Sequence, residues 1–165
     1  MRNSCERVPE NRIRAFKASL FHLLPRECKG SFPFSERIKL LLRAWRGYYF
    51  YYITEGSVLC AYTFLKRNYF GKYAFMGKKD LLINPYYVAP GYRGKGLGTQ
   101  MLCAVLSQLP EKHGDIWAVV KDDNISSIRA LKKAGFQQIG FSSKNGWSHR
   151  LSKAETNLII FCYKG

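Results

Sequence analysis

Residues 93–98 read Arg-Gly-Lys-Gly-Leu-Gly, and they separate an apolar, tyrosine-rich run at 81–88 from a helical pattern at 99–109. Glycines at alternate positions let the backbone approach a ligand closely, and the N–H groups that open the following helix have no carbonyl partners within it. These donors and the positive end of the helix dipole favour an anion, and Arg93 and Lys95 add positive charge. Because glycine loops also form plain turns, the stretch alone is consistent with either a phosphate-sized anion site or a tight turn.

The length and composition of the chain predict one domain over residues 1–165. With 165 residues, 47% of them hydrophobic, the chain can bury a sizeable core. Its 27 Lys and Arg residues against 11 Asp and Glu give a net charge of +16, and the excess is spread along the chain rather than gathered in a tail. A basic protein of this kind attracts polyanions, so nucleic acid, ribosomes, membrane surfaces and phosphorylated cofactors are all candidate partners.

Cysteine usage and the absence of long apolar runs indicate the compartment. The five cysteines include no Cys-x-x-Cys pair, and their odd number cannot form a complete disulfide framework, which favours reduced thiols. The N-terminus lacks the apolar core of a signal peptide, and no apolar run approaches the ~18 residues of a membrane helix. We therefore expect a soluble, cytoplasmic protein. No spacing of ligand residues suggests a metal site, so no metal is expected.

The first part of the chain predicts helical structure followed by a β-hairpin. Apolar residues at 13–24 fall near helical spacing before Pro and Gly break the pattern. A firm helix is expected at 35–46. Its apolar face is marked by Ile38, Leu41, Leu42 and Trp45. The runs at 48–54 and 58–65 are mostly aromatic or β-prone and flank a Gly-containing turn, which is typical of a hairpin.

The run at 81–88 predicts an interrupted strand. Pro85 has no N–H to contribute to a ladder, so we expect it at a sheet edge or a bulge. A bulge leaves backbone groups unpaired and re-aims side chains, and here it would lie shortly before the glycine loop.

The remaining chain alternates strands and helices. A short buried strand at 116–120 precedes a helix that begins near Asn124 and ends at Gly135. Two further strands are expected at 136–141 and 158–163, separated by a polar loop. This order predicts an α/β fold with a central mixed β-sheet, splayed parallel strands and flanking helices. The glycine loop then lies at the carboxyl end of its strand, where such sheets bind ligands.

Residues 87–98 read Tyr-Val-Ala-Pro-Gly-Tyr-Arg-Gly-Lys-Gly-Leu-Gly and resemble the acyl-CoA-binding signature of the GNAT superfamily of N-acetyltransferases. That family's second signature, an Asn beginning a helix that closes in Gly-Phe, is matched by Asn124 and by Gly135-Phe136. The motifs occur in the family's order, and the resemblance covers roughly residues 48–141. No motif matches residues 1–34.

The resemblance implies a GNAT-like fold and acetyl-CoA as co-substrate. The strand backbone at Tyr86, Tyr87 and Val88 would pair with the pantetheine arm, and Asn124 would hydrogen-bond the cofactor. The pyrophosphate would be held by Arg93 and the N–H groups of Gly94, Lys95, Gly96, Leu97, Gly98 and Thr99.

The implied reaction is direct attack of a primary amine on the thioester. The oxyanion would be stabilised by the N–H of Tyr87 or Val88, and a base must remove the amine's proton. Two positions that often hold carboxylates in the family are Asn84 and Val119, and the position of the acid Tyr is Leu131. The candidate catalytic residues are Asn84, which could orient a water, together with Tyr86 and Tyr87 as acids.

Several interpretations remain open at this stage. The acceptor could be a small amine, an aminoglycoside-like polyamine, or a protein amine, and the net charge favours neutral or anionic acceptors such as proteins bound to RNA. The alternative to an enzyme is a non-catalytic acyl-CoA-binding or RNA-associated module, as a monomer or homodimer. Structural roles are favoured for Cys103 as a small buried side chain, for Asp80 as half of a surface ion pair, and for His149 as a solvated loop residue.

Overall fold

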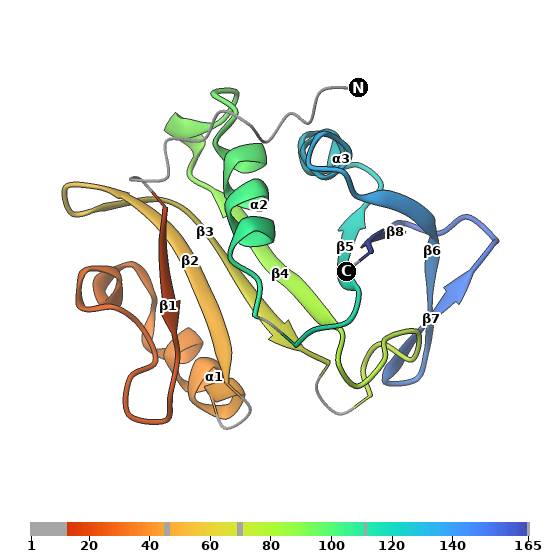
Figure 1. Cartoon of the computed structure of the whole chain (residues 1–165), viewed down its shortest axis with the longest axis horizontal. Coiled ribbons are helices and arrows are strands. Elements are labelled where there is room, and N and C mark those ends of the chain that lie inside the picture. Colours follow the sequence, from red (N-terminus) through yellow and green to blue (C-terminus); the bar gives the residue numbers. More distant parts are fainter. Residues whose placement is uncertain (1–12, 45–46, 69–70, 111, 165) are drawn as a thin grey trace.

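The computed structural model describes residues 13–44, 47–68, 71–110 and 112–164 (Figure 1). Its strands are β1 (Arg14–Lys17), β2 (Tyr48–Glu55), β3 (Val58–Arg67), β4 (Leu81–Val88), β5 (Ile116–Lys121), β6 (Gln137–Asn145), β7 (Ser148–Ser152) and β8 (Leu158–Tyr163). Its helices are α1 (Phe34–Ala44), α2 (Leu97–Ser107) and α3 (Ile125–Lys133), with 3-10 turns η2 (Arg26–Ser31) and η3 (Pro90–Tyr92). None of the helices in these ranges is long and apolar enough to cross a lipid bilayer.

The described strands form one mixed sheet in the order β1-β2-β3-β4-β5-β8-β6-β7. Only β4 and β5 run parallel, and their pairing is limited to residues 81–83 against 116–118. Beyond this short ladder the two strands diverge, as Figure 1 shows between the β1–β3 side on the left and the β6–β7 side on the right. The predicted mixed sheet with splayed parallel strands is therefore confirmed.

The bulge expected at Pro85 is present in β4. Thr63 pairs with Tyr86 while Leu65 pairs with Ile83, so β4 has one residue more than β3 over this interval. The buried hydroxyl of Thr63 donates to the carbonyl oxygen of Pro85 at 2.9 Å, which satisfies an acceptor that the bulge removes from the ladder.

Side chains on the two faces of the sheet belong to different clusters. One cluster packs between the sheet and the helices α2 and α3, with Leu102, Ile116 and Leu131 among its buried members. On the opposite face, an aromatic cluster around Phe50 lies under α1 and η2, and a smaller cluster around Trp117 lies under residues 73–76. Side chains of β2, β4, β5 and β8 alternate between clusters on opposite faces, as expected for strands covered on both faces.

The helix expected at 35–46 is confirmed as α1, but its predicted apolar face is wrong. Leu40 and Ala44 are buried against the sheet, whereas Ile38 and Leu41 are 47% and 45% exposed. Apolar residues occur all around this helix, so periodicity alone did not select the face that the aromatic cluster covers. The side chains of Leu42 and Trp45 lie outside the described residues.

Two further expectations are corrected at the edges of the sheet. Residues 14–17 form β1, not a helix, because they pair antiparallel with residues 49–52 of β2. The polar loop expected after residue 141 contains β7, which pairs with β6 over residues 148–152. In both cases pairing with a neighbouring strand outweighs a weak local pattern.

The cysteines of the described residues largely agree with the prediction of reduced thiols. Cys28, Cys60 and Cys162 are free and buried. Cys103 is disulfide-bonded, so the expectation of reduced thiols is wrong at this position. An odd number of cysteines excludes complete pairing but not a single disulfide. Cys5 lies outside the described residues.

Candidate functional site

A cavity of about 510 Å³ opens where β4 ends and α2 begins. Four elements line it: the end of β4, the glycine loop with η3, the first turn of α2, and one side of α3. The lining residues are Tyr86, Tyr87, Val88, Tyr92, Arg93, Gly94, Gly96, Leu97, Gly98, Thr99, Asn124, Ser126, Ser127, Arg129, Ala130 and Lys133. The structure thus brings together both sequence motifs, which lie on separate helices.

The glycine loop presents backbone donors to this cavity. Gly94 and Gly96 have φ values of +76° and +79°, a left-handed conformation that favours glycine. Gly96 is the N-cap of α2, and its carbonyl accepts the N–H of Gln100 at 3.1 Å. The N–H groups of residues 97–99 come before this first hydrogen bond of the helix, so no carbonyl within α2 accepts them. All three residues line the cavity. This arrangement suits an anion.

Tyr86 forms the floor beneath the start of α2. A Cβ atom added to Gly98 would come within 1.8 Å of the Tyr86 hydroxyl oxygen, so only glycine permits this contact. Burial raises the pKa of Tyr86, which keeps the phenol protonated at neutral pH. Gly98 therefore has a packing role in addition to its place in the loop.

The edge of β4 that faces β5 is open beside the cavity. The N–H of Ala89 donates to the Cys60 carbonyl in β3 at 2.8 Å. Since successive residues of a strand direct their backbone groups to opposite sides, those of Val88 face away from β3. The Val88 carbonyl accepts the Arg93 Nε–H at 3.0 Å, which fixes the loop to the strand end.

One side of α3 forms the opposite wall. Asn124 caps the helix, and its Oδ1 accepts the N–H of Ser127 at 3.2 Å and the hydroxyl of Ser126 at 3.1 Å. The cap uses the amide oxygen, so the amide nitrogen is the group of Asn124 suited to donate to a ligand.

The charged side chains that line the cavity are all basic. Arg93 comes from the loop, and Arg129 and Lys133 come from α3; the lining residues include no Asp, Glu or His. Such a site favours a polyanion. The sequence interpretation missed the two α3 cations, together with Ser126 and Ser127. Their signal was the helical spacing of 126, 129 and 133 after the Asn of the second motif.

Three predicted site residues lie differently from the rest. Asn84 lies next to the bulge and does not line the cavity. Lys95 does not line it either, and its ammonium lies 5.4 Å from the centre of the Tyr92 ring. Tyr87 lines the cavity, but its ring packs against Tyr62 on the aromatic face, with 5.2 Å between ring centres. Tyr86 and Tyr87 therefore point to opposite faces of the sheet.

Three tyrosines of β2, and the residues at two of the family's catalytic positions, have structural roles. Tyr48, Tyr51 and Tyr52 are buried, and their hydroxyls donate to the Leu23 carbonyl, the Gln108 carbonyl and the Glu27 carboxylate. None of these three tyrosines lines the cavity. Val119 packs against the Trp117 cluster, and Leu131 is 2% exposed in the main core.

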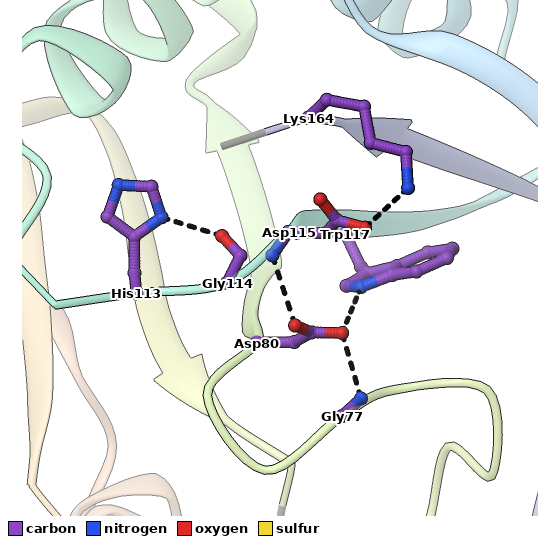
Figure 2. A network of polar contacts seen from close by, with 7 residues as sticks. All are labelled: Gly77, Asp80, His113, Gly114, Asp115, Trp117 and Lys164. Carbon is purple, nitrogen blue, oxygen red and sulfur yellow. Dashed lines mark hydrogen bonds and ion pairs between the residues drawn. The ribbon is translucent and has the colours of Figure 1, made fainter.

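Asp80 joins the starts of β4 and β5 at the end remote from the glycine loop. Figure 2 shows its carboxylate accepting the N–H of Gly77 (2.8 Å), the N–H of Asp115 (3.0 Å) and the Trp117 indole N–H (2.8 Å). The expected surface ion pair of Asp80 with Lys78 or Lys79 is absent from the described ion pairs, and Lys164 instead pairs with Asp115 at 2.6 Å. Asp80 therefore has a structural role, because its hydrogen bonds connect the segments that begin β4 and β5.

His149 lies on β7, not in a solvated loop. Its Nδ1 is 2.9 Å from the Ser142 hydroxyl oxygen, and its ring stacks on Tyr73 with 5.2 Å between centres. Burial lowers the pKa of His149, and the positive charges of Lys72 and Lys144 lower it further. The side chain does not line the cavity.

Comparison with known families decides how this cavity is interpreted. A model of the Acetyltransferase (GNAT) family matches residues 17–136. The chain belongs to this family. The resemblance noted at the glycine loop and at Asn124 is confirmed, and membership of the GNAT family supports acyl transfer as the general chemistry. No curated protein matches the chain.

Solved structures share the fold at low sequence identity. A GNAT-family acetyltransferase from Bacillus cereus is 18% identical with a TM-score of 0.59, covering 92% of this chain and 96% of its own. A putative acetyltransferase from Salmonella typhimurium with its cofactor acetyl-CoA is 21% identical with a TM-score of 0.56, covering 81% and 74%. A ribosomal-protein-alanine N-acetyltransferase from Brucella melitensis is 20% identical with a TM-score of 0.59, covering 81% and 79%. These likenesses establish the GNAT fold.

Proposed function

We propose that this GNAT protein transfers an acetyl group from acetyl-CoA to a primary amine by direct attack. The observation that carries the proposal is the cavity in which the N–H groups that open α2 meet basic side chains and the open edge of β4. A long ligand with a phosphate-bearing end and an amide-bearing arm fits both chemistries. The Salmonella neighbour is described with acetyl-CoA as its cofactor, which agrees with this choice.

The glycine loop binds the pyrophosphate in this proposal. The donors are the N–H groups of Gly94, Lys95, Gly96, Leu97, Gly98 and Thr99. Arg93 adds a cation and holds the loop against Val88. Backbone donors at a helix start bind phosphate without the entropy cost of ordering long side chains.

The open edge of β4 binds the pantetheine arm. The arm lies along Tyr86–Val88 in the position that the diverging β5 leaves open, where the backbone groups of Tyr86 and Val88 face away from β3. Asn124 donates its amide N–H to the same ligand from α3. Of the two donors considered for the oxyanion, the N–H of Val88 is favoured, because strand alternation directs the N–H of Tyr87 toward β3.

Proton transfer falls to residues on the far side of β4. Asn84 cannot accept the amine's proton itself at neutral pH, so its role is to orient a water that does. Tyr87 reaches both the cavity and the aromatic face, and it is the favoured acid for the departing thiolate. Tyr86 is assigned to support the loop, because its hydroxyl packs under Gly98.

The acceptor is assigned only by charge. A net charge of +16 favours a neutral or anionic acceptor, including a protein amine in a ribonucleoprotein, over a polycation. Association with nucleic acid or ribosomes follows from the same charge. The proposed setting is the cytoplasm, where acetyl-CoA is available as substrate.

A second candidate function is a non-catalytic acyl-CoA-binding module. It is favoured by one observation, that the cavity's lining residues include no Asp, Glu or His to act as a base. Both candidates predict CoA binding, and only the enzyme predicts turnover.

Thiol release separates the two candidates. The full chain is mixed with acetyl-CoA and a panel of small amines, peptides and ribosomal proteins, while free thiol is followed against background hydrolysis. Release that depends on an acceptor and is lost in Gly96→Val supports the enzyme. Tight CoA binding without release for any acceptor supports the binding module, and absence of CoA binding contradicts both.

A further inference from the structure

The wall of the cavity formed by α3 changes from neutral to basic along the helix. Asn124, Ser126 and Ser127 line the cavity at the helix start, whereas Arg129 and Lys133 line it toward the helix end. At about 1.5 Å per residue, this wall extends for roughly 14 Å. A ligand lying along it therefore meets hydrogen-bonding groups at one end and two cations at the other.

The two cations are not explained by the folded chain. Neither Arg129 nor Lys133 forms an ion pair with an acidic side chain in the described ranges. They are four positions apart on one side of α3, a spacing at which like charges destabilise a helix. Two cations on one side of the helix, both lining the cavity, are suited to bind an anion there.

Stabilisation of the helix dipole does not account for this pair. Lys132 and Lys133 both lie in the last turn of α3, where a positive charge is favourable. Lys132 does not line the cavity, so it supplies the dipole effect without contributing to the site. Arg129 lies a turn earlier, where the dipole effect is weaker.

We propose that Arg129 and Lys133 bind the ribose 3′-phosphate of coenzyme A and so select CoA over dephospho-CoA. This inference rests on the proposed function, in which the glycine loop holds the pyrophosphate. Coenzyme A carries one phosphate beyond the pyrophosphate, a monoester with a charge of about −1.5 to −2 at neutral pH. The paired cations match that charge, and the guanidinium of Arg129 can donate two parallel hydrogen bonds to it.

The same pair gives the ligand a direction along the cavity. The basic end of α3 attracts the nucleotide, and the neutral start at Asn124 faces the amide-containing arm. The acyl group is thereby directed away from the cations and toward the open edge of β4.

Calorimetric titration of CoA and dephospho-CoA into the full chain tests the inference. The wild type is expected to bind CoA about tenfold more tightly than dephospho-CoA, as for a solvent-exposed charge-assisted contact. Arg129→Gln and Lys133→Gln should each lose most of this preference by weakening CoA alone. Lys132→Gln is the matched control, and it should retain the full preference.

Adenosine 3′,5′-bisphosphate provides a probe without a thiol or an acyl group. Its affinity should fall in Arg129→Gln and Lys133→Gln and should stay at the wild-type value in Lys132→Gln, with melting temperatures confirming that each variant is folded. Equal binding of CoA and dephospho-CoA by the wild type would overturn the inference, as would equal losses in all three variants. If the folded wild type binds neither form of CoA, the proposed function fails instead.

Discussion

The two sides of β4 differ in whether their residues are close together or distant in the sequence. On the side of α2 and α3, backbone donors and basic side chains converge on one cavity, and residues 86–99 supply most of it. On the side of α1, Tyr87 and Tyr62 lead into a buried aromatic cluster whose members are distant in sequence. The geometry of the first side is local and a short motif specifies it, whereas the second depends on tertiary packing.

In the proposed function, this difference separates cofactor binding from proton transfer. The cavity contains three basic side chains, whereas Asn84, proposed for proton relay, lies outside it. Substitutions on one side should therefore leave the other side's function intact, and each of the following changes tests that separation.

The largest expected effect is on cofactor affinity. Gly96→Val places a β-branched residue at a φ of +79°, which such residues avoid, so the loop should shift and misdirect its N–H donors. Loss of two charge-assisted hydrogen bonds predicts CoA binding about a hundredfold weaker by calorimetry. Gly146→Val, at a φ of +56° in the turn after β6, carries comparable strain outside the cavity and should bind CoA normally. Equal loss of affinity in both variants would contradict the local role of the loop.

Asp80→Asn should affect stability without affecting the cofactor. The amide cannot accept all three N–H bonds and brings its own donors toward Trp117, so the free energy of unfolding should fall by about 2 kcal/mol in urea titrations. Because Asp80 lies at the opposite end of β4 from the loop, the dissociation constant for CoA should not change. A CoA affinity that falls with stability would show that the two ends of the strand are coupled.

Asn84→Ala tests the proton-transfer side. Loss of the water-orienting amide should lower kcat about tenfold, a modest effect for a relay, while the KM for acetyl-CoA stays constant. Asn84→Gln keeps the amide at a longer reach and should recover part of the rate. A raised KM for acetyl-CoA with unchanged kcat would instead place Asn84 in cofactor binding.

The smallest effect is on the pH dependence of stability. Because burial lowers the pKa of His149, the unfolded chain takes up a proton there before the folded protein does. The free energy of unfolding should therefore decrease as the pH falls from about 6.5, the pKa of an unperturbed histidine, through the lower pKa of His149 in the folded protein. His149→Gln should reduce this slope in urea titrations between pH 7 and 5, and Lys72→Gln should reduce it partly. An unchanged slope in His149→Gln would remove this residue as the cause.

The elements around β4 were predictable because their signals are local. Pro85 cannot enter a ladder, alternate glycines precede a helix, and Asn124 caps the next one, so the bulge, the loop and α3 were placed correctly. These features specify the GNAT fold and the positions of most of the residues that line the cavity.

The remaining features depend on contacts that spacing does not encode. Whether Ile38 or Leu40 faces inward is decided by the aromatic cluster beneath α1, and β1 exists because β2 offers an edge. The helical spacing of Arg129 and Lys133 puts them on one side of α3, but only the fold shows that this side lines the cavity. The proposed roles of Asn84 and Tyr87 in proton transfer stay predictions, since they depend on side-chain positions relative to a bound substrate.

The short ladder between β4 and β5 has a further consequence for molecular recognition. Unpaired strand edges at the rim of a sheet can recruit other chains and lead to aggregation. Here the unpaired edge lies inside the sheet, where β4 and β5 diverge after residues 83 and 118. Because neighbouring strands and helices flank this edge, we expect it to admit a slender, extended molecule and to exclude a β-strand of another protein with its bulky side chains.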